Sequence, residues 1–153
     1  MYTYIRTYFK SSKPSNEEPA CNCRQHEKCP VQGYCQKVIV YKATLNVIDE
    51  EKIYIGSTNN FKNRYRTHIN SFKSITNQNS TTLSAYIWKK LLNPNPPITW
   101  EILKIVQPYT PGNDSCPLCL EEKAAIGRHA SDPKCLNKRS ELANACRHKG
   151  KYK

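Results

Sequence analysis

YIGSTNNFKNRYRTH, residues 54–68, runs from a short apolar strand that ends at a glycine turn into a basic amphipathic helix. At about 100° per residue, a stripe of the helix surface roughly 40° wide holds three aromatic residues: Phe61, Tyr65 and Phe72. Arg64 and His68 are four residues apart and project one above the other at the edge of that stripe. Such a pair could hold a phosphate group. Taken alone, this stretch is more typical of a solvated helix face with a packed histidine.

The segment that precedes this stretch, residues 37–52, favours the interpretation that Arg64 and His68 hold a phosphate group. Residues 37–45, KVIVYKATL, form a second β-branched run. The polar residues 46–52 that follow are few enough to connect two strands as a hairpin. The sequence therefore predicts two antiparallel strands, one presenting Tyr41 and the other Tyr54, followed at once by the helix with Arg64 and His68.

The segments after it complete a small α/β pattern. Thr81 and Thr82 suit a helix N-cap, and the apolar residues behind them recur with a helical period up to Leu91. Prolines follow, and residues 98–106 then alternate as a third strand with Ile98, Trp100 and Ile102 on one face. Residues 116–126 are expected to enter a helix. The order strand, strand, helix, helix, strand, helix predicts an α/β domain with an antiparallel sheet.

Composition and charge favour a polyanionic partner. The 153 residues support one domain, and 24 Lys and Arg against 12 Asp and Glu give a formal net charge of +12. Binding to a nucleic acid would then be strongly salt-sensitive. The sequence contains no run of 18 or more apolar residues, so no transmembrane helix is predicted. Residues 1–20 are expected to be a flexible basic arm and linker, which suggests that the chain is part of a larger protein.

Eight cysteines fall into two clusters. The first, in residues 21–36, could supply four thiolates to one zinc ion, with His26 as a possible substitute: Cys21, Cys23, Cys29 and Cys35. The alternative is a set of reduced or paired cysteines in an ordered loop. The second cluster opens with the knuckle spacing of Cys116 and Cys119. Cys146 and His148 are expected to close it, and His129 and Cys135 compete for those places.

These segments resemble the GIY-YIG endonucleases. Tyr54-Ile55-Gly56 matches the second triplet of that family, whereas Ile39-Val40-Tyr41 keeps the tyrosine of the first triplet and lacks its glycine. Further matches are the CNC run at 21–23, IWKK at 87–90, CPLCLEEK at 116–123 and LNKRSEL at 136–142. With them, residues 21–152 look like the endonuclease domain of Penelope-like retroelements. Cys135 would then belong to core sequence, as a buried thiol.

The resemblance implies an architecture and a reaction. Residues 37–153 would be a small nuclease domain, a three-stranded antiparallel sheet flanked by helices, with structural Zn²⁺ in its N-terminal and C-terminal elements. The reaction would be phosphodiester hydrolysis with one divalent metal ion, usually Mg²⁺. Glu122 would hold that ion, although Glu121 and Glu122 are also typical of an exposed helix start.

The resemblance also implies roles for the other residues. Arg64 would clamp the scissile phosphate, and Tyr41 would be the general base or relay for the attacking water. A free tyrosine has a pKa of about 10, so a cation such as Lys42 or the metal would have to lower it. Tyr54 and His68 would position the water or Tyr41. Asn137 would support the site.

DNA is the expected substrate. The candidate contacts are basic residues of the predicted helices and of the C-terminal segment: Lys62, Arg66, Lys73, Lys89, Lys90 and Arg139. The nuclease would nick target DNA in the nucleus to prime reverse transcription, beside a reverse transcriptase domain of the same polyprotein and its RNA, with no membrane partner. The alternative is a zinc-stabilised nucleic-acid-binding module without cleavage. Pure binding needs no set of two tyrosines, an arginine, a histidine and a glutamate, so the sequence favours the nuclease.

Overall fold

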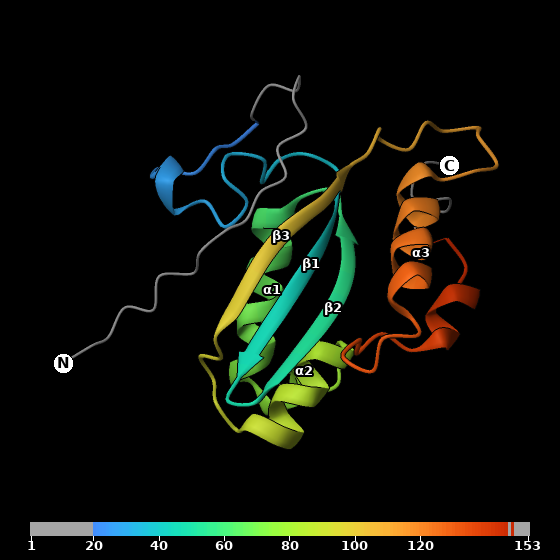
Figure 1. Ribbon diagram of the computed structural model, residues 1–153. Coiled ribbons are helices and arrows are strands. Elements are labelled where there is room, and N and C mark those ends of the chain that lie inside the picture. The colour runs from blue at the N-terminus through green and yellow to red at the C-terminus, as the bar shows by residue number, and fades with distance from the viewer. Residues whose placement is uncertain (1–19, 147, 149–153) are drawn as a thin grey trace.

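The computed structural model describes residues 20–146 and 148. The predicted arm and linker lies outside these residues except for Ala20. Figure 1 shows a three-stranded antiparallel sheet with helices α1 and α2 over one face, while helix α3 lies beyond strand β2. The predicted fold, an antiparallel three-stranded sheet with flanking helices, is confirmed. Among the described residues, no helix combines the length and apolarity needed to cross a membrane.

Strands β1 (Ile39–Val47) and β2 (Glu50–Thr58) form one long hairpin. Val47 pairs with Glu50, so only two residues turn the chain, and Asp49 has a φ of 64°. The predicted connection over residues 46–52 is therefore wrong, because most of it continues the two strands. The residues at the hairpin tip are mostly exposed and polar, so they lack the apolar alternation that marks a half-buried strand.

Strand β3 (Ile98–Ile105) pairs with the other edge of β1 and gives the strand order β2-β1-β3. Its three predicted inward residues are all buried: Ile98, Trp100 and Ile102. Opposite the step from Val40 to Tyr41, β3 carries one extra residue, Leu103. Such a bulge twists the ladder locally and re-aims the side chains beside it.

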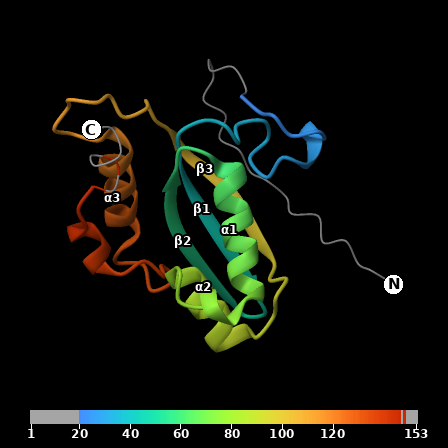
Figure 2. The ribbon, with the colours of Figure 1, turned by 180° about the vertical axis from the view of Figure 1, so that it is seen from behind.

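Helix α1 (Phe61–Lys73) covers the sheet along its length, as Figure 2 shows from behind. Asn60 caps its start by accepting from the Asn63 N–H at 3.1 Å. The predicted stripe is confirmed, since Phe61 and Phe72 are buried and the half-buried Tyr65 packs on the same core. The first amide of α1 donates to the Cys35 carbonyl at 2.9 Å, so the cysteine-rich segment abuts this helix.

Helix α2 (Thr82–Tyr86) begins at the predicted cap, where Thr81 accepts from the Ser84 N–H at 3.0 Å. The helix continues as a π-helical turn, η3 (Ile87–Leu91). Across this layer, the Trp88 indole N–H donates to the Ser71 carbonyl at 2.7 Å and ties η3 to α1. The remaining short turns are η1 (His26–Lys28), η2 (Ile75–Asn77) and η4 (Arg139–Ala143).

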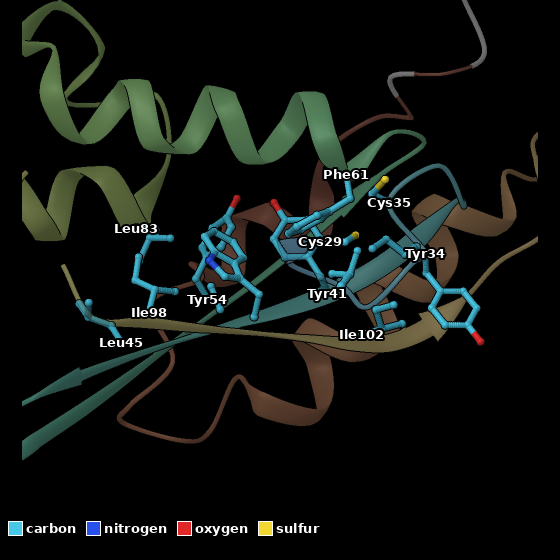
Figure 3. Close-up of a cluster of buried hydrophobic side chains, with 14 of the residues drawn as sticks. Cys29, Tyr34, Cys35, Tyr41, Leu45, Tyr54, Phe61, Leu83, Ile98 and Ile102 are labelled. Carbon is cyan, nitrogen blue, oxygen red and sulfur yellow. The ribbon is translucent and has the colours of Figure 1, made fainter. Parts of the chain in front are cut away.

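Two cores hold these layers. The larger lies between the sheet and α1 and includes Cys29 and Cys35, which Figure 3 shows near Phe61. The smaller lies between the opposite sheet face and α3 (Pro117–His129), around Ile55 and Ile126. The cysteine-rich segment is thus packed into the same core as the sheet.

The free edge of β2 is covered by residues 134–137. The Ile53 N–H donates to the Lys134 carbonyl at 2.9 Å, and the Leu136 N–H returns a 2.7 Å bond to the Ile53 carbonyl. Covering an edge in this way satisfies backbone groups that would otherwise template pairing with another chain. It also fixes the C-terminal segment against the strand that carries Tyr54.

Candidate active site

Tyr41 lies at the centre of a buried hydrogen-bonded group formed by β1 and α1. Its hydroxyl is 2.7 Å from His68 Nε2 and accepts from Arg64 Nε at 3.2 Å. Arg64 and His68 lie one turn apart on α1, as predicted, and both reach the same oxygen. A neutral imidazole protonated on Nδ1 can accept the phenol proton at Nε2.

Burial sets the protonation states of this group. It raises the pKa of Tyr41 well above the ordinary value, and the charge and hydrogen bond of Arg64 only partly oppose it. Burial, followed by repulsion from Arg64, lowers the pKa of His68 to about 3. At neutral pH the pair is therefore a protonated phenol beside a neutral imidazole.

The expectation that Lys42 lowers the pKa of Tyr41 is wrong. Successive residues of a strand face opposite sides of the sheet, so Lys42 points away from the phenol. Its ammonium group instead forms an ion pair with Glu101 at 2.9 Å. Arg64 is the cation that acts on Tyr41.

Gly56 makes room for the Tyr41 ring. The two residues are cross-strand partners, and a Cβ on Gly56 would lie 2.5 Å from Tyr41 Cζ. Ile39 stands where the first triplet of the family has its glycine, and its side chain is fully buried in the larger core. A glycine at that position is therefore not needed to make room for the Tyr41 ring. Its loss leaves the packing around Tyr41 intact.

Tyr54 stands beside this group. Its ring centroid is 6.5 Å from that of Tyr41 and 5.7 Å from that of His68, and Figure 3 shows both tyrosine hydroxyls directed towards α1. Burial raises the pKa of Tyr54, and the nearby Arg64 opposes the shift. Unlike Tyr41, which has no exposed surface, Tyr54 lines a cavity.

That cavity, of about 460 Å³, brings Glu122 to the same place as Tyr54 and Arg64. Glu122 comes from α3 and lies one turn beyond Cys119. The side chain of the neighbouring Glu121 does not line the cavity and instead forms an ion pair with Lys104 at 2.8 Å. The two adjacent carboxylates thus have different surroundings, and Glu122 is the one in the candidate site.

Asn137 is bonded to the backbone of β2 beside Tyr54. Its Oδ1 accepts from the Ile55 N–H at 2.7 Å and its Nδ2 donates to the Ile55 carbonyl at 2.9 Å, so the side-chain amide continues the edge pairing of β2. The same Nδ2 donates to Glu141 Oε2 at 2.7 Å. Glu141, which no pattern in the sequence marks, also lines the cavity.

The first cysteine cluster gathers as predicted. Among the described residues, the Sγ atoms of Cys21, Cys23, Cys29 and Cys35 lie within 4.8 Å of one another. Cys35 Sγ is 3.4 Å from that of Cys21 and 3.6 Å from that of Cys23. Thiolates around one zinc ion lie about 3.8 Å apart, since each Zn–S bond is about 2.3 Å long and the geometry is tetrahedral. His26 is exposed and outside the cluster.

The second cluster also gathers, and it resolves the alternatives. Cys116, Cys119, Cys146 and His148 place their ligand atoms within 4.8 Å of one another. His129 instead has Nδ1 2.9 Å from the Ala125 carbonyl, one turn back on α3. Cys135 is only half-buried and lies beside Asn137 in the segment that covers β2, so its description as a buried core thiol is wrong. Both donor sets suit zinc.

The basic candidates are spread over several elements. Arg66 and Lys73 are exposed on α1, Lys89 and Lys90 on η3, and Arg139 on η4. Lys62 is half-buried, and its ammonium group donates to Asn22 Oδ1 at 3.2 Å, which ties it to the cysteine-rich segment.

Comparison with known proteins agrees with this geometry. Residues 37–103 match the family model described as the GIY-YIG catalytic domain. The matched range contains both tyrosines, Arg64 and His68, and it ends before Glu122 and Asn137. Searches of curated proteins and of solved structures give no match. The matched domain supports a nuclease of the GIY-YIG type.

Proposed function

We propose that this chain is a metal-dependent DNA endonuclease that hydrolyses a phosphodiester bond in the cavity between α1 and α3. The observation that carries the proposal is that Arg64 and His68 both contact the Tyr41 hydroxyl. These contacts lie beside a cavity lined by Tyr54 and Glu122. One partner satisfies the hydroxyl of a buried tyrosine, so an arginine and a histidine on the same oxygen are more than packing requires.

Arg64 can serve the phenol and the substrate together. Its Nε donates to Tyr41, and the guanidinium has further N–H donors in a planar fork that matches phosphate oxygens. The residue also lines the cavity. A phosphate bound there would therefore lie next to Tyr41, and charge that grows on its oxygens would be stabilised by Arg64.

Tyr41 and His68 would move the proton of the attacking water. Because burial keeps Tyr41 protonated, we infer a relay in which the phenol oxygen takes the proton of the water as its own proton passes to His68 Nε2. No free phenolate is required. A bound phosphate would also offset the repulsion by Arg64, which is one of the two causes of the low pKa of His68. Tyr41 is fully buried with Arg64 Nε 3.2 Å from its hydroxyl, so the water must gain access to that oxygen when the substrate binds.

The site fits a divalent cation such as Mg²⁺. Glu122 offers hard carboxylate oxygens on the cavity wall, and the volume of about 460 Å³ leaves room for the waters that Mg²⁺ retains. When bound, such an ion supplies positive charge for the phosphate and leaving oxygens. We propose Zn²⁺ in the two cysteine clusters, as a structural ion that does not touch the substrate.

The test is incubation of the purified chain with supercoiled plasmid, with Mg²⁺ and with excess EDTA. Nicked or linear products that disappear in EDTA support the endonuclease. DNA binding that falls steeply with salt but yields no product in either condition would instead favour the zinc-stabilised binding module.

We further propose that the nick primes reverse transcription of a Penelope-like retroelement in the nucleus, beside a reverse transcriptase domain of the same polyprotein and its RNA. The support is the resemblance of residues 21–152 to that group. Priming requires a free 3′-hydroxyl at the nick. Extension of the nicked strand by a purified polymerase with labelled nucleotides tests this, and a nick that cannot be extended excludes a priming role.

A further inference from the structure

Glu141 is a second carboxylate on the wall of the proposed active-site cavity. It comes from η4, whereas Glu122 comes from α3, and Tyr54 and Arg64 line the same space. Both carboxylates are close enough to act on Tyr54, since each contributes to the raised pKa of that phenol. The two acids are therefore neighbours in one site although 19 positions separate them in the sequence.

Hydrogen bonds hold the Glu141 carboxylate in place. Its Oε2 accepts from Asn137 Nδ2 at 2.7 Å, and its Oε1 accepts from the Lys138 N–H at 3.3 Å. Asn137 is itself bonded twice to Ile55, which is next to Tyr54 on β2. A short chain of bonds thus fixes Glu141 relative to the strand that carries Tyr54. Each carboxylate oxygen still has a lone pair to offer.

A phosphate bound in the cavity would leave an excess of negative charge there. Arg64 and Lys123 are the positive residues on its wall, and the Lys123 ammonium group already donates to the Asn144 carbonyl at 2.7 Å. A DNA phosphate bound at Arg64 would face both carboxylates, and like charges that share one cavity repel each other. A divalent cation between the carboxylates and the phosphate removes this conflict.

We propose that Glu141 binds the divalent cation together with Glu122, directly or through one of its waters. This inference rests on the proposed function, because it concerns the same site. Asn137 then acts as a positioning residue, which orients a metal-binding carboxylate without touching the substrate. Supporting groups of this kind fix the orientation of metal ligands in other sites.

The direct test measures metal binding without catalysis. Mn²⁺ is titrated into the zinc-loaded full chain, and the free ion is followed by its electron paramagnetic resonance signal. Glu141→Gln keeps the size of the side chain and removes its charge; the amide oxygen can still accept from Asn137 Nδ2, while the longer bond from the Lys138 N–H is lost. We expect it to raise the Kd for Mn²⁺ by about tenfold or more, as Glu122→Gln should also do. Glu121→Gln, whose parent residue pairs with Lys104, is the matched control and should leave the Kd unchanged.

A second readout separates a metal-binding role from a merely structural one. The nicking rate of Glu141→Gln should need about tenfold more Mg²⁺ for half-saturation and should recover at high Mg²⁺. A structural role would lower the rate at every Mg²⁺ concentration and leave half-saturation unmoved. Unchanged Mn²⁺ affinity in Glu141→Gln, with an active parent, overturns the inference alone. A parent that binds Mn²⁺ through both residues but never cleaves DNA overturns the proposed function and leaves the inference standing.

Discussion

The phenol ring of Tyr41 lies over Gly56, its cross-strand partner, in the space that a Cβ at that position would fill. Strand pairing therefore does more than bring two tyrosines near each other. It also places Gly56, which has no side chain, opposite Tyr41. The Tyr41 ring crosses that position, and its hydroxyl reaches Arg64 and His68. The same relationship gives a substitution that perturbs Tyr41 without altering it.

Gly56→Ala should destabilise the fold and displace Tyr41. Overpacking of a buried site typically costs about 1–3 kcal/mol, and the group that must give way here is a buried aromatic ring. Gly127→Ala is the matched control, because a Cβ there meets nothing within 4 Å and the site is exposed on α3. Alanine in that helical position should stabilise the fold by about 0.5–1 kcal/mol. Urea unfolding measures both changes, and equal stability of the two variants would refute this packing.

Arg64→Ala should lower the nicking rate by about a hundredfold or more, since loss of a preorganised charged donor costs about 3 kcal/mol of transition-state stabilisation. Arg64→Lys should not rescue it, because one ammonium group cannot bond Tyr41 and a phosphate in the same planar fork. Arg66→Ala is the control on the exposed side of α1 and should mainly weaken DNA binding. Single-turnover rates on plasmid DNA check this. Parental activity in Arg64→Ala would remove Arg64 from the reaction.

Burial of His68 should make stability depend on pH. The pKa is about 3 in the folded chain and about 6.5 when unfolded, so between these values the unfolded chain binds a proton that the folded chain does not. This contribution to stability is complete above about pH 6.5 and is lost as the pH falls towards 3. The slope is at most about 1.4 kcal/mol per pH unit.

His68→Gln removes the titration and keeps an acceptor for the Tyr41 hydroxyl. Between pH 6.5 and 5, the free energy of unfolding should fall less steeply in this variant than in the parent. Urea unfolding at matched zinc content measures the difference, because acid also weakens zinc binding. Parallel pH profiles for the two proteins would mean that His68 is protonated as readily in the fold as outside it.

The residues that could be predicted from the sequence are those joined by local geometry. Tyr54, Arg64 and His68 fall within one strand, turn and helix, and Tyr41 lies on the neighbouring strand of a hairpin. The side-chain periods of a strand and a helix are enough to predict that these residues lie close together. Lys42 is next to Tyr41 in the sequence but on the other face of the sheet, so the same two-residue period places it away from the phenol.

The missed features depend on distant contacts. The bond from the Ile55 amide to Asn137 spans 82 residues, and the position of Glu141 follows from it. A glutamate four residues after an asparagine is ordinary in a short helical turn, so no local pattern marked Glu141 as a cavity residue. No local sequence pattern predicts the bulge at Leu103 or the π turn of η3 either.

The chain should carry two zinc ions per molecule, because each cluster presents four ligand atoms within 4.8 Å of one another. Cys35→Ser should lose one of them. It should also loosen the start of α1, since the Cys35 carbonyl accepts from the Phe61 amide at 2.9 Å. Elemental analysis and amide hydrogen exchange measure the two effects. Protein purified without chelator that contains no zinc would exclude both sites.

His148 should act on the reaction only through the fold. Its Nδ1 lies 3.4 Å from Cys116 Sγ and 3.3 Å from Cys119 Sγ, at the start of the helix that carries Glu122. His148→Ala should therefore release zinc, lower the Tm by about 5 °C or more and reduce nicking, with no rescue by added Mg²⁺. Glu122→Ala should abolish nicking with a nearly unchanged Tm, because a catalytic divalent ion exchanges freely and leaves the fold intact.

His129→Ala is the matched control for that experiment, since His129 contacts the Ala125 carbonyl of its own helix and lies outside the cluster. It should keep both zinc ions and a Tm close to that of the parent. Zinc content by elemental analysis, thermal unfolding and plasmid nicking are measured on the same preparations. If His148→Ala melts with the parent at equal zinc content while His129→Ala loses an ion, the fourth ligand of the second cluster is His129. Nicking by His148→Ala should then remain at the parental rate.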